Sequence, residues 1–311
     1  MEAGRIRLSV IIVSYNTREL LARCLASIAA EPQPPDEVIV VDNASADDSV
    51  VMVREQFPHV QVIANAENRG FAAATNQGLQ SATGDFLCLL NPDTELFPGA
   101  LAALAAFLAA HAEVGVAGPT LLHTDGTYQH AAFRFPTLPM ALIDFFPLNH
   151  RLLNSRLNGR YPFRLYEHPF AMDHPLGACM MVRREACADV GLLDERFFMY
   201  CEEIDWCRRI KQADWEIMHV PGARVVHHGG QSTKQTAGRM FVELHRSRFR
   251  LFAKHHGRGY QCAARAIVTV GMLWQLIGLL PQRVRHFRDQ ILQDRWRSRL
   301  QVLALALKGE N

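Results

Sequence analysis

Acidic side chains in two parts of the chain have the types and spacing that could do chemistry. Asp93 follows a proline at the end of a short apolar run, and a carboxylate there can hold a divalent metal that neutralises a diphosphate. Three further acids, Glu202, Glu203 and Asp205, stand together, with Glu202 and Asp205 at helical spacing. A carboxylate of this kind can act as a general base toward a hydroxyl group. Both groups also have a structural alternative, because Asn-Pro-Asp is a common turn and acids in a first helical turn stabilise any helix.

Four apolar runs predict the buried strands that position these acids, and the first three of them are rich in β-branched residues. They alternate with segments of helical spacing, so the chain up to Asp93 has the pattern β-α-β-α-β-α-β. This alternation predicts an α/β fold with a right-handed, doubly wound, mostly parallel sheet. The predicted strands are residues 8–13, 37–41, 60–63 and 86–90.

Polar residues follow three of the predicted strands. Parallel strands present their carboxyl ends at one edge, where an open α/β sheet binds its ligands. At that edge Asp42 could accept the imide N–H of a uracil or thymine ring, although it also suits a turn. The three polar tips are Ser14-Tyr15-Asn16, Asp42-Asn43 and Asn91-Pro92-Asp93.

Composition and missing motifs exclude several classes of protein. A formal net charge of +2 over 311 residues argues against a nucleic-acid binder. No Gly-x-Gly-x-x-Gly follows the first predicted strand and no Gly-x-x-x-x-Gly-Lys-Ser/Thr occurs, which disfavours dinucleotide dehydrogenases and P-loop ATPases. The seven scattered cysteines form no Cys-x-x-Cys pair and indicate reduced thiols in a cytosolic protein. The first apolar run is too short for a signal peptide.

An ordered set of motifs resembles the inverting family-2 glycosyltransferases of GT-A fold, and within them the bacterial rhamnosyltransferase-type enzymes of cell-envelope polysaccharide synthesis. The resemblance covers about residues 8–235. The motifs are Val-Ile-Ile-Val-Ser-Tyr-Asn (10–16), Asp-Asn-Ala-Ser (42–45), Asn-Arg-Gly-Phe-Ala (68–72), Leu-Asn-Pro-Asp (90–93), Gly-Ala-Cys-Met (177–180), Phe-Phe-Met-Tyr-Cys-Glu-Glu-Ile-Asp-Trp-Cys-Arg-Arg (197–209) and Val-His-His-Gly-Gly-Gln-Ser (226–232).

This resemblance implies roles for individual residues. It makes Asp93 and His227 contacts of a Mg²⁺ or Mn²⁺ ion or of the diphosphate, although a lone histidine after a strand is more often structural and His228 stands beside it. The family usually has Glu-Asp where this chain has Glu202 and Glu203, so Glu203 stands in the place of the general base and reaches one methylene further. Glu202 and Asp205 are the alternative bases. The donor-binding residues expected from the motifs and the strand tips are Ser14, Tyr15, Asn16, Asp42, Asn68, Gly70 and Asn91.

The chain divides into two predicted regions. Residues 1–235 are expected to form the GT-A domain, in which the long aromatic segment 121–174 is either an acceptor-side insertion or an insertion with its own small core. Residues 236–311 are expected to be helical. Their apolar run 266–280, about fifteen residues, is shorter than the roughly 20 needed to span a bilayer. The basic residues after it suit peripheral contact with the inner face of the cytoplasmic membrane, and packing on the domain or in a homodimer is the alternative.

The leading hypothesis is an inverting, metal-dependent transfer of a sugar from a nucleotide-diphosphate donor to a glycan or lipid-linked saccharide. The family resemblance suggests rhamnose from dTDP-rhamnose. A sugar-phosphate nucleotidyltransferase is a second hypothesis, but such an enzyme should carry a Gly-rich loop after the first strand, where Ser14-Tyr15-Asn16-Thr17 has no glycine. A non-catalytic nucleotide-sugar binding protein is a third, and the acids at 202–205 argue against it.

Overall fold

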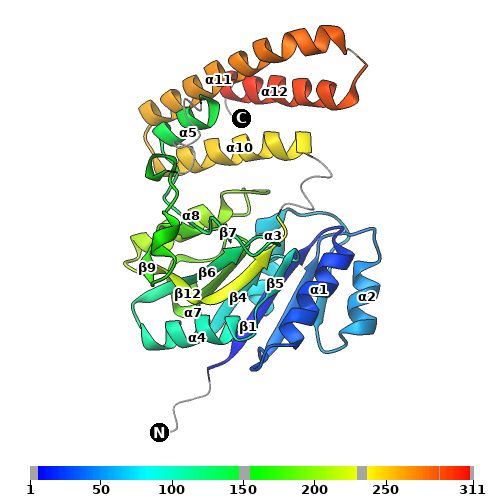
Figure 1. The fold of residues 1–311 in the computed structure, drawn as a ribbon, viewed down its shortest axis with the longest axis vertical. Helices are drawn as coiled ribbons and strands as arrows, with labels where there is room; N and C mark the ends of the chain where they lie inside the picture. The colour runs from blue at the N-terminus through cyan, green and yellow to red at the C-terminus, as the bar shows by residue number, and fades with distance from the viewer. Residues whose placement is uncertain (1–5, 147–154, 230–236, 287, 309–311) are drawn as a thin grey trace. The chain divides into compact units, whose positions relative to one another are not determined.

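The computed structural model describes residues 6–146, 155–229, 237–286 and 288–308 (Figure 1). The chain divides into two compact units. The sheet unit comprises Met1–Phe135, Tyr161–Phe198 and Glu202–Ser232. The helical unit comprises Pro136–Arg160, Met199–Cys201 and Thr233–Asn311. The segment 121–174 is therefore shared between the two units.

A mixed sheet, mainly parallel in its first half, forms the centre of the sheet unit. The strands run in the order β3-β2-β1-β4-β11-β6-β12-β5. β1 pairs in parallel with β2 and β4, whereas β11 is antiparallel to both β4 and β6. These strands are β1 (Leu8–Ser14), β2 (Glu37–Asp42), β3 (Gln61–Ala64), β4 (Phe86–Leu90), β5 (Thr94–Leu96), β6 (Val114–Leu122), β11 (Cys179–Arg183) and β12 (Glu216–His227). The predicted α/β fold with a mostly parallel sheet is confirmed.

Short strands and helices complete the sheet unit. β7 (Tyr128–Gln129) pairs with β6, β9 (Phe170–Ala171) pairs with β12, and β8 (Ala132–Phe133) pairs with β10 (His174–Pro175). The helices are α1 (Arg18–Ala29), α2 (Ser49–Gln56), α3 (Phe71–Ser81), α4 (Ala100–Ala110), η2 (Phe163–Leu165), α7 (Arg184–Val190) and α8 (Glu202–Gln212).

The first strands and helices form where the apolar pattern predicts them. All side chains of β1 and β4 are buried, as expected for strands covered on both faces. α1 turns Leu21, Leu25 and Ile28 toward the core at helical spacing. α3 lies close to β1 at Gly78, where an added Cβ would stand 2.3 Å from the Ile11 side chain. The packing of these elements holds the strands in place, and the carboxyl ends of the strands, which carry the polar tips, lie at one edge of the sheet.

Part of the aromatic segment is packed inside the sheet unit. The Tyr166 ring is buried, and its hydroxyl accepts hydrogen bonds from the backbone N–H groups of Ala131 and Ala132, both at 2.9 Å. The same ring lies against His219 of β12, with ring centroids 4.6 Å apart. These contacts give this part of the segment a structural role.

The helical unit contains α5 (Leu138–Phe145), η1 (Arg156–Asn158), α10 (Ala237–His255), α11 (Arg258–Arg285) and α12 (Gln290–Lys308). Its small core joins Phe145 to Val268, Met272 and Val302. α11 approaches α5 at Gly271, where an added Cβ would stand 2.3 Å from the Phe145 ring. Phe145 is therefore a core residue of this unit.

α11 is longer than the predicted apolar run 266–280. It has 28 residues, which corresponds to a length of about 42 Å at the rise of an α-helix. Among the described residues it is the one helix long and apolar enough to cross a membrane. Length and composition alone are weak evidence, since the core helix of a soluble protein can pass the same test. The expectation that this region is too short to span was wrong, because the helix begins before the apolar run 266–280, at Arg258, and continues after it through Pro281 to Arg285.

All seven cysteines are free thiols. Six of them are buried, and Cys262 near the start of α11 is exposed.

Candidate active site

Asp42 ends β2 at the carboxyl edge of the sheet, beside Ser14 of β1 in the parallel register. It is only 2% exposed, and its Oδ1 accepts a hydrogen bond of 2.9 Å from the Ser45 backbone N–H. Its Oδ2 is buried and has no hydrogen-bond partner among the described residues. A buried carboxylate oxygen without a donor is costly, so this atom is suited to accept an N–H from a ligand.

Asn43 holds the turn at 68–70 beside this tip. Its Nδ2 donates to Asn68 Oδ1 at 3.0 Å and to the Gly70 carbonyl at 3.1 Å, and its Oδ1 accepts from the Arg69 backbone N–H at 3.0 Å. Gly70 has φ +85°, and a Cβ there would stand 2.6 Å from the Phe198 carbonyl oxygen. Only glycine fits this position. Asn43 was predicted as part of a polar strand tip but was not included among the donor-binding residues.

The other strand tips stand at the same edge. Asn16 has φ 51°, and its Oδ1 accepts a hydrogen bond of 2.8 Å from the Ala46 backbone N–H. Tyr15 before it is partly exposed. The Ser14 hydroxyl is buried and lies 3.0 Å from the Thr17 hydroxyl, which gives Ser14 a structural partner.

Asp93 and His227 lie together at the far end of this edge. The Nε2 atom of His227 is 3.4 Å from Oδ1 of Asp93, and both side chains are buried. β12 brings them together by pairing antiparallel with β5, in a register that sets His227 opposite Thr94. On its other side the His227 Nδ1 lies 3.0 Å from Oε1 of Gln129. In the tautomer whose Nδ1–H donates to Gln129, the Nε2 lone pair would face Asp93, which is the form that a metal ligand needs.

A carboxylate and an imidazole in this arrangement fit a divalent metal such as Mn²⁺. No group of three or more His, Cys, Asp or Glu side chains suited to a metal occurs in the described part of the chain. Asp93 and His227 could supply two ligands, and diphosphate oxygens and water could supply others. The neighbouring His228 is engaged elsewhere, with its Nε2 2.6 Å from Oε1 of Glu95. The rest of this motif, residues 230–232, lies outside the described residues.

Glu202 and Glu203 open helix α8. One carboxylate oxygen of each, Oε2, is buried and has no hydrogen-bond partner among the described residues. Burial raises the pKa of Glu203 to about 7, and burial together with the nearby charge of Glu203 raises the pKa of Glu202. A carboxylate whose pKa lies near neutrality is suited to accept a proton at physiological pH.

Asp205 has a different environment. Its side chain is fully buried, and its Oδ2 accepts a hydrogen bond of 3.0 Å from Nε of Arg209. Arg209 also donates to the backbone carbonyls of Val190 and Leu192, so the ion pair connects α8 to the turn after α7. These contacts favour a structural role for Asp205 over catalysis.

A short series of contacts connects Glu203 with Asp93. Glu203 packs against Gly177, where an added Cβ would stand 3.4 Å from the Glu203 Cγ. The carbonyl of the next residue, Ala178, accepts a hydrogen bond of 2.9 Å from the Asn91 backbone N–H, two positions before Asp93. The carboxylates at 93 and 203 therefore stand at the same edge of the sheet.

The fold and this edge of the sheet are those of the GT-A fold, which solved structures share. The mannosyltransferase PcManGT from Pyrobaculum calidifontis, in complex with GDP-Man and Mn²⁺, has a TM-score of 0.58 at 18% identity and covers 98% of this chain and 87% of its own. The crystal structure of GalNAc-T7 with UDP, GalNAc and Mn²⁺ has a TM-score of 0.54 at 20% identity and covers 73% of this chain and 44% of its own.

The family model for glycosyl transferase family 2 matches residues 9–191, more than half of the chain. The chain belongs to this family. It is therefore a glycosyltransferase that moves a sugar from a nucleotide donor to a saccharide acceptor, as predicted. A curated relative, the N-acetylglucosaminyl-diphospho-decaprenol L-rhamnosyltransferase of Mycobacterium tuberculosis (strain CDC 1551 / Oshkosh), is 28% identical over 292 residues, covering 89% of this chain and 91% of the relative.

Proposed function

We propose that the protein is an inverting, metal-dependent rhamnosyltransferase that uses dTDP-rhamnose and a lipid-linked saccharide acceptor in cell-envelope polysaccharide synthesis. The observation that carries the proposal is the pair of unsatisfied carboxylates, Asp42 and Glu203, at the ligand-binding edge of the GT-A sheet. Asp42 suits the imide N–H of thymine or uracil, a ring donor that adenine and cytosine lack and that guanine shares. The sugar and the acceptor class follow the relative in M. tuberculosis, whose name specifies both.

Glu203 is the proposed general base. It takes the proton from the acceptor hydroxyl while that oxygen attacks the anomeric carbon of the donor sugar. The new C–O bond forms on the face opposite the bond that breaks, and the nucleoside diphosphate leaves with the bonding electrons. The anomeric configuration is therefore inverted, and no covalent enzyme intermediate is required. Glu202 is the alternative base, because its Oε2 also has no hydrogen-bond partner among the described residues.

Asp93 and His227 are the proposed ligands of a Mg²⁺ or Mn²⁺ ion. Such an ion, when bound, would neutralise the charge of the departing diphosphate. Gln129 fixes the ring of His227 for this role through its contact with Nδ1. Ser14, Tyr15, Asn16, Asn68, Gly70 and Asn91 are retained as proposed donor contacts, since they stand at the same edge.

An assay of nucleoside diphosphate release tests the proposal. Purified enzyme is incubated with dTDP-rhamnose, UDP-hexoses or GDP-mannose, with and without Mg²⁺ or Mn²⁺, and with an acceptor analogue that carries a saccharide diphosphate. The proposal expects metal-dependent release from dTDP-rhamnose and a product with inverted anomeric configuration by NMR. Faster release from GDP-mannose, retention of configuration, or full activity in EDTA would refute it.

The place of action follows from the acceptor. A saccharide carried on a polyprenyl lipid is available at a membrane surface, so we propose that the enzyme works in the cytoplasm at the inner face of the cytoplasmic membrane. The segment 121–174 is proposed to contribute to the acceptor side, through aromatic rings that remain partly exposed, such as Phe163.

A further inference from the structure

Helix α11 has an exposed apolar face. Six of its large apolar side chains are exposed; five recur at steps of three or four residues and Trp274 adjoins one of them, which places all six along one side of the helix. Trp274 is 63% exposed and Ile277 is 61% exposed. No charged residue occurs between Arg265 and Arg283. The stripe consists of Val270, Leu273, Trp274, Ile277, Leu280 and Val284.

The opposite face of α11 is occupied by protein. Val268, Met272 and Leu276 are buried, and Met272 belongs to the core that includes Phe145 and Val302. α12 runs along this helix, and Arg299 of α12 donates to Gln275 Oε1 at 2.9 Å. Only 28% of the most apolar stretch of α11 is buried inside the protein. The outer stripe therefore lacks the cover that a core helix would have.

The charge of this region is strongly positive. Residues 258–308 contain nine Arg or Lys and two Asp, a formal charge of +7, whereas the whole chain carries only +2. The remaining residues therefore carry −5. Arg283 and Arg285 stand directly at the end of the apolar stripe. An apolar stripe that ends in arginines has the composition of helices that lie on anionic membranes.

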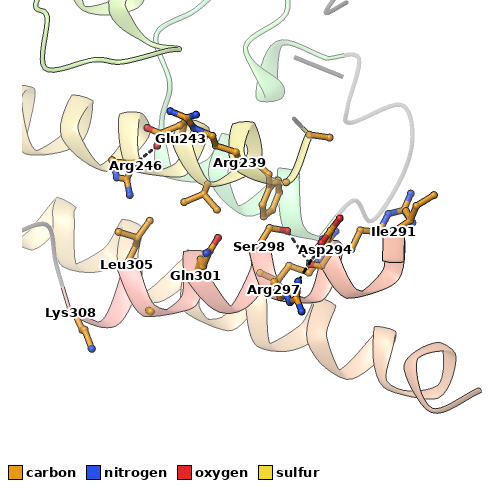
Figure 2. Close-up of a pocket in the computed structure, with 17 residues that line it drawn as sticks. Arg239, Glu243, Arg246, Ile291, Asp294, Arg297, Ser298, Gln301, Leu305 and Lys308 are labelled. Atoms are coloured by element: carbon orange, nitrogen blue, oxygen red, sulfur yellow. Dashed lines mark hydrogen bonds and ion pairs between the residues drawn. The ribbon is translucent and has the colours of Figure 1, made fainter. Parts of the chain in front are cut away.

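A groove of about 1220 Å³ lies between α10 and α12, where α10 adds Arg239, Arg246 and Glu243 to the charges of α12 (Figure 2). Its sides carry Arg239, Arg246, Arg297 and Lys308, and two acids, Glu243 and Asp294, pair with arginines there.

We propose that α11 is an in-plane membrane anchor whose outer stripe enters an anionic lipid surface while its inner face stays in the protein. In such a helix the apolar face sinks about 5–10 Å into the boundary between headgroups and acyl chains. Arg283 and Arg285 then bind lipid phosphates at the same level. The occupant of the stripe is the membrane that carries the proposed lipid-linked acceptor, but this proposal does not depend on which sugar is transferred.

Two other arrangements fit the structure less well. If α11 spanned the bilayer, it would either lose its contacts with the core of the helical unit or carry the arginines of α12 into the bilayer. Each charge buried in the bilayer is costly. A second copy of the chain on the stripe would bring the same arginines of both copies together if the interface were two-fold symmetric, and like charges repel. An anionic membrane satisfies both the apolar stripe and the positive charge.

Vesicle binding by the full chain tests the proposal. The protein is centrifuged with vesicles of phosphatidylglycerol and phosphatidylethanolamine, or of phosphatidylcholine alone. Binding is expected to the anionic vesicles, with release by alkaline carbonate. The variant Leu273→Glu/Ile277→Glu should bind at least about 100-fold more weakly, because it removes two inserted side chains and adds two charges. The control Val51→Glu makes the same kind of change at a site 50% exposed on α2 and should bind normally.

A second measurement distinguishes an in-plane helix from a spanning one. Lipids with bromine near the headgroup end of the acyl chain should quench the fluorescence of Trp274 more than lipids with bromine near the methyl end. Trp274→Phe should remove this difference. Stronger quenching by deep bromine, or resistance to carbonate, would overturn the in-plane anchor in favour of a span.

Two further outcomes would also overturn the proposal. One is equal binding of the double Glu variant and the wild type to anionic vesicles. The other is a wild-type dimer, seen by light scattering, that the double variant dissociates while neither protein binds vesicles. Nucleoside diphosphate release with a water-soluble acceptor should be the same in the double variant and the wild type, which separates failure of this proposal from failure of the proposed function.

Discussion

Replacing Glu203 with glutamine should lower turnover and raise stability in the same protein. Burial raises the pKa of this carboxyl from 4.5 to about 7, so the folded protein holds the proton more tightly than the unfolded chain. The folded state is therefore destabilised as the pH rises from about 4.5 through about 7, where the carboxylate must ionise in its buried site. A shift of this size corresponds to at most about 3 kcal/mol at pH 8. Glutamine carries no charge and avoids this cost.

Ionisation of Glu203 destabilises the folded protein, but the same ionisation is needed for catalysis. A general base must be deprotonated, so kcat/KM of the wild type should rise with pH and level off above about 7. One pH unit below the pKa only about a tenth of the sites would be active. Glu203→Gln should lose about 10²–10⁴-fold in turnover and leave donor affinity nearly unchanged.

Rates of nucleoside diphosphate release between pH 5.5 and 9, together with thermal melts at pH 6 and pH 8, measure both effects. The variant should melt higher than the wild type at pH 8, with a smaller difference at pH 6. Glu216→Gln, at an exposed position at the start of β12, is the matched control and should change neither rate nor melting. Near-normal turnover of Glu203→Gln would transfer the role to Glu202, and a lower melting temperature at pH 8 would refute the electrostatic reasoning.

Three further predictions follow from the site. Asp93→Asn and His227→Ala should each raise the Mn²⁺ concentration needed for half-maximal activity at least about tenfold, and unchanged metal titrations would refute the two-ligand site. Asp42→Asn should weaken dTDP binding in calorimetry by about 1–3 kcal/mol, whereas equal affinity would exclude a contact with the base. Gly70→Ala should destabilise the protein by more than about 1 kcal/mol in thermal melts, while Gly126→Ala, with similar φ and open space around it, should cost less.

Local patterns were sufficient to predict the first half of the sheet. The runs that became β1 and β4 are continuous and apolar, because each strand is covered on both faces, and such runs can be recognised without knowing their neighbours. The ion pair between Asp205 and Arg209 could also have been predicted from the sequence, since residues four apart on a helix are neighbours. It was missed because the acids were considered without the basic residues that follow them.

The rest of the site depends on pairings between distant segments. His227 meets Asp93 only because β12 pairs with β5 in one particular register, and no local spacing encodes that register. The insertion of antiparallel β11 between β4 and β6 has the same origin, and it brings Gly177 to Glu203. The length of α11 was underestimated because the prediction followed the apolar run 266–280 alone, whereas the helix also includes the polar and basic residues on both sides of it, from Arg258 to Arg285.

The single exposed thiol has a practical consequence. Because the other six cysteines are buried, a maleimide reagent should attach to the native enzyme at Cys262 alone. This position lies near the start of α11, so a spin label or fluorophore there would serve for spectroscopy without any mutagenesis. In air the same thiol would join two chains covalently, and preparations stored without reductant should show a dimer band on gels that dithiothreitol removes.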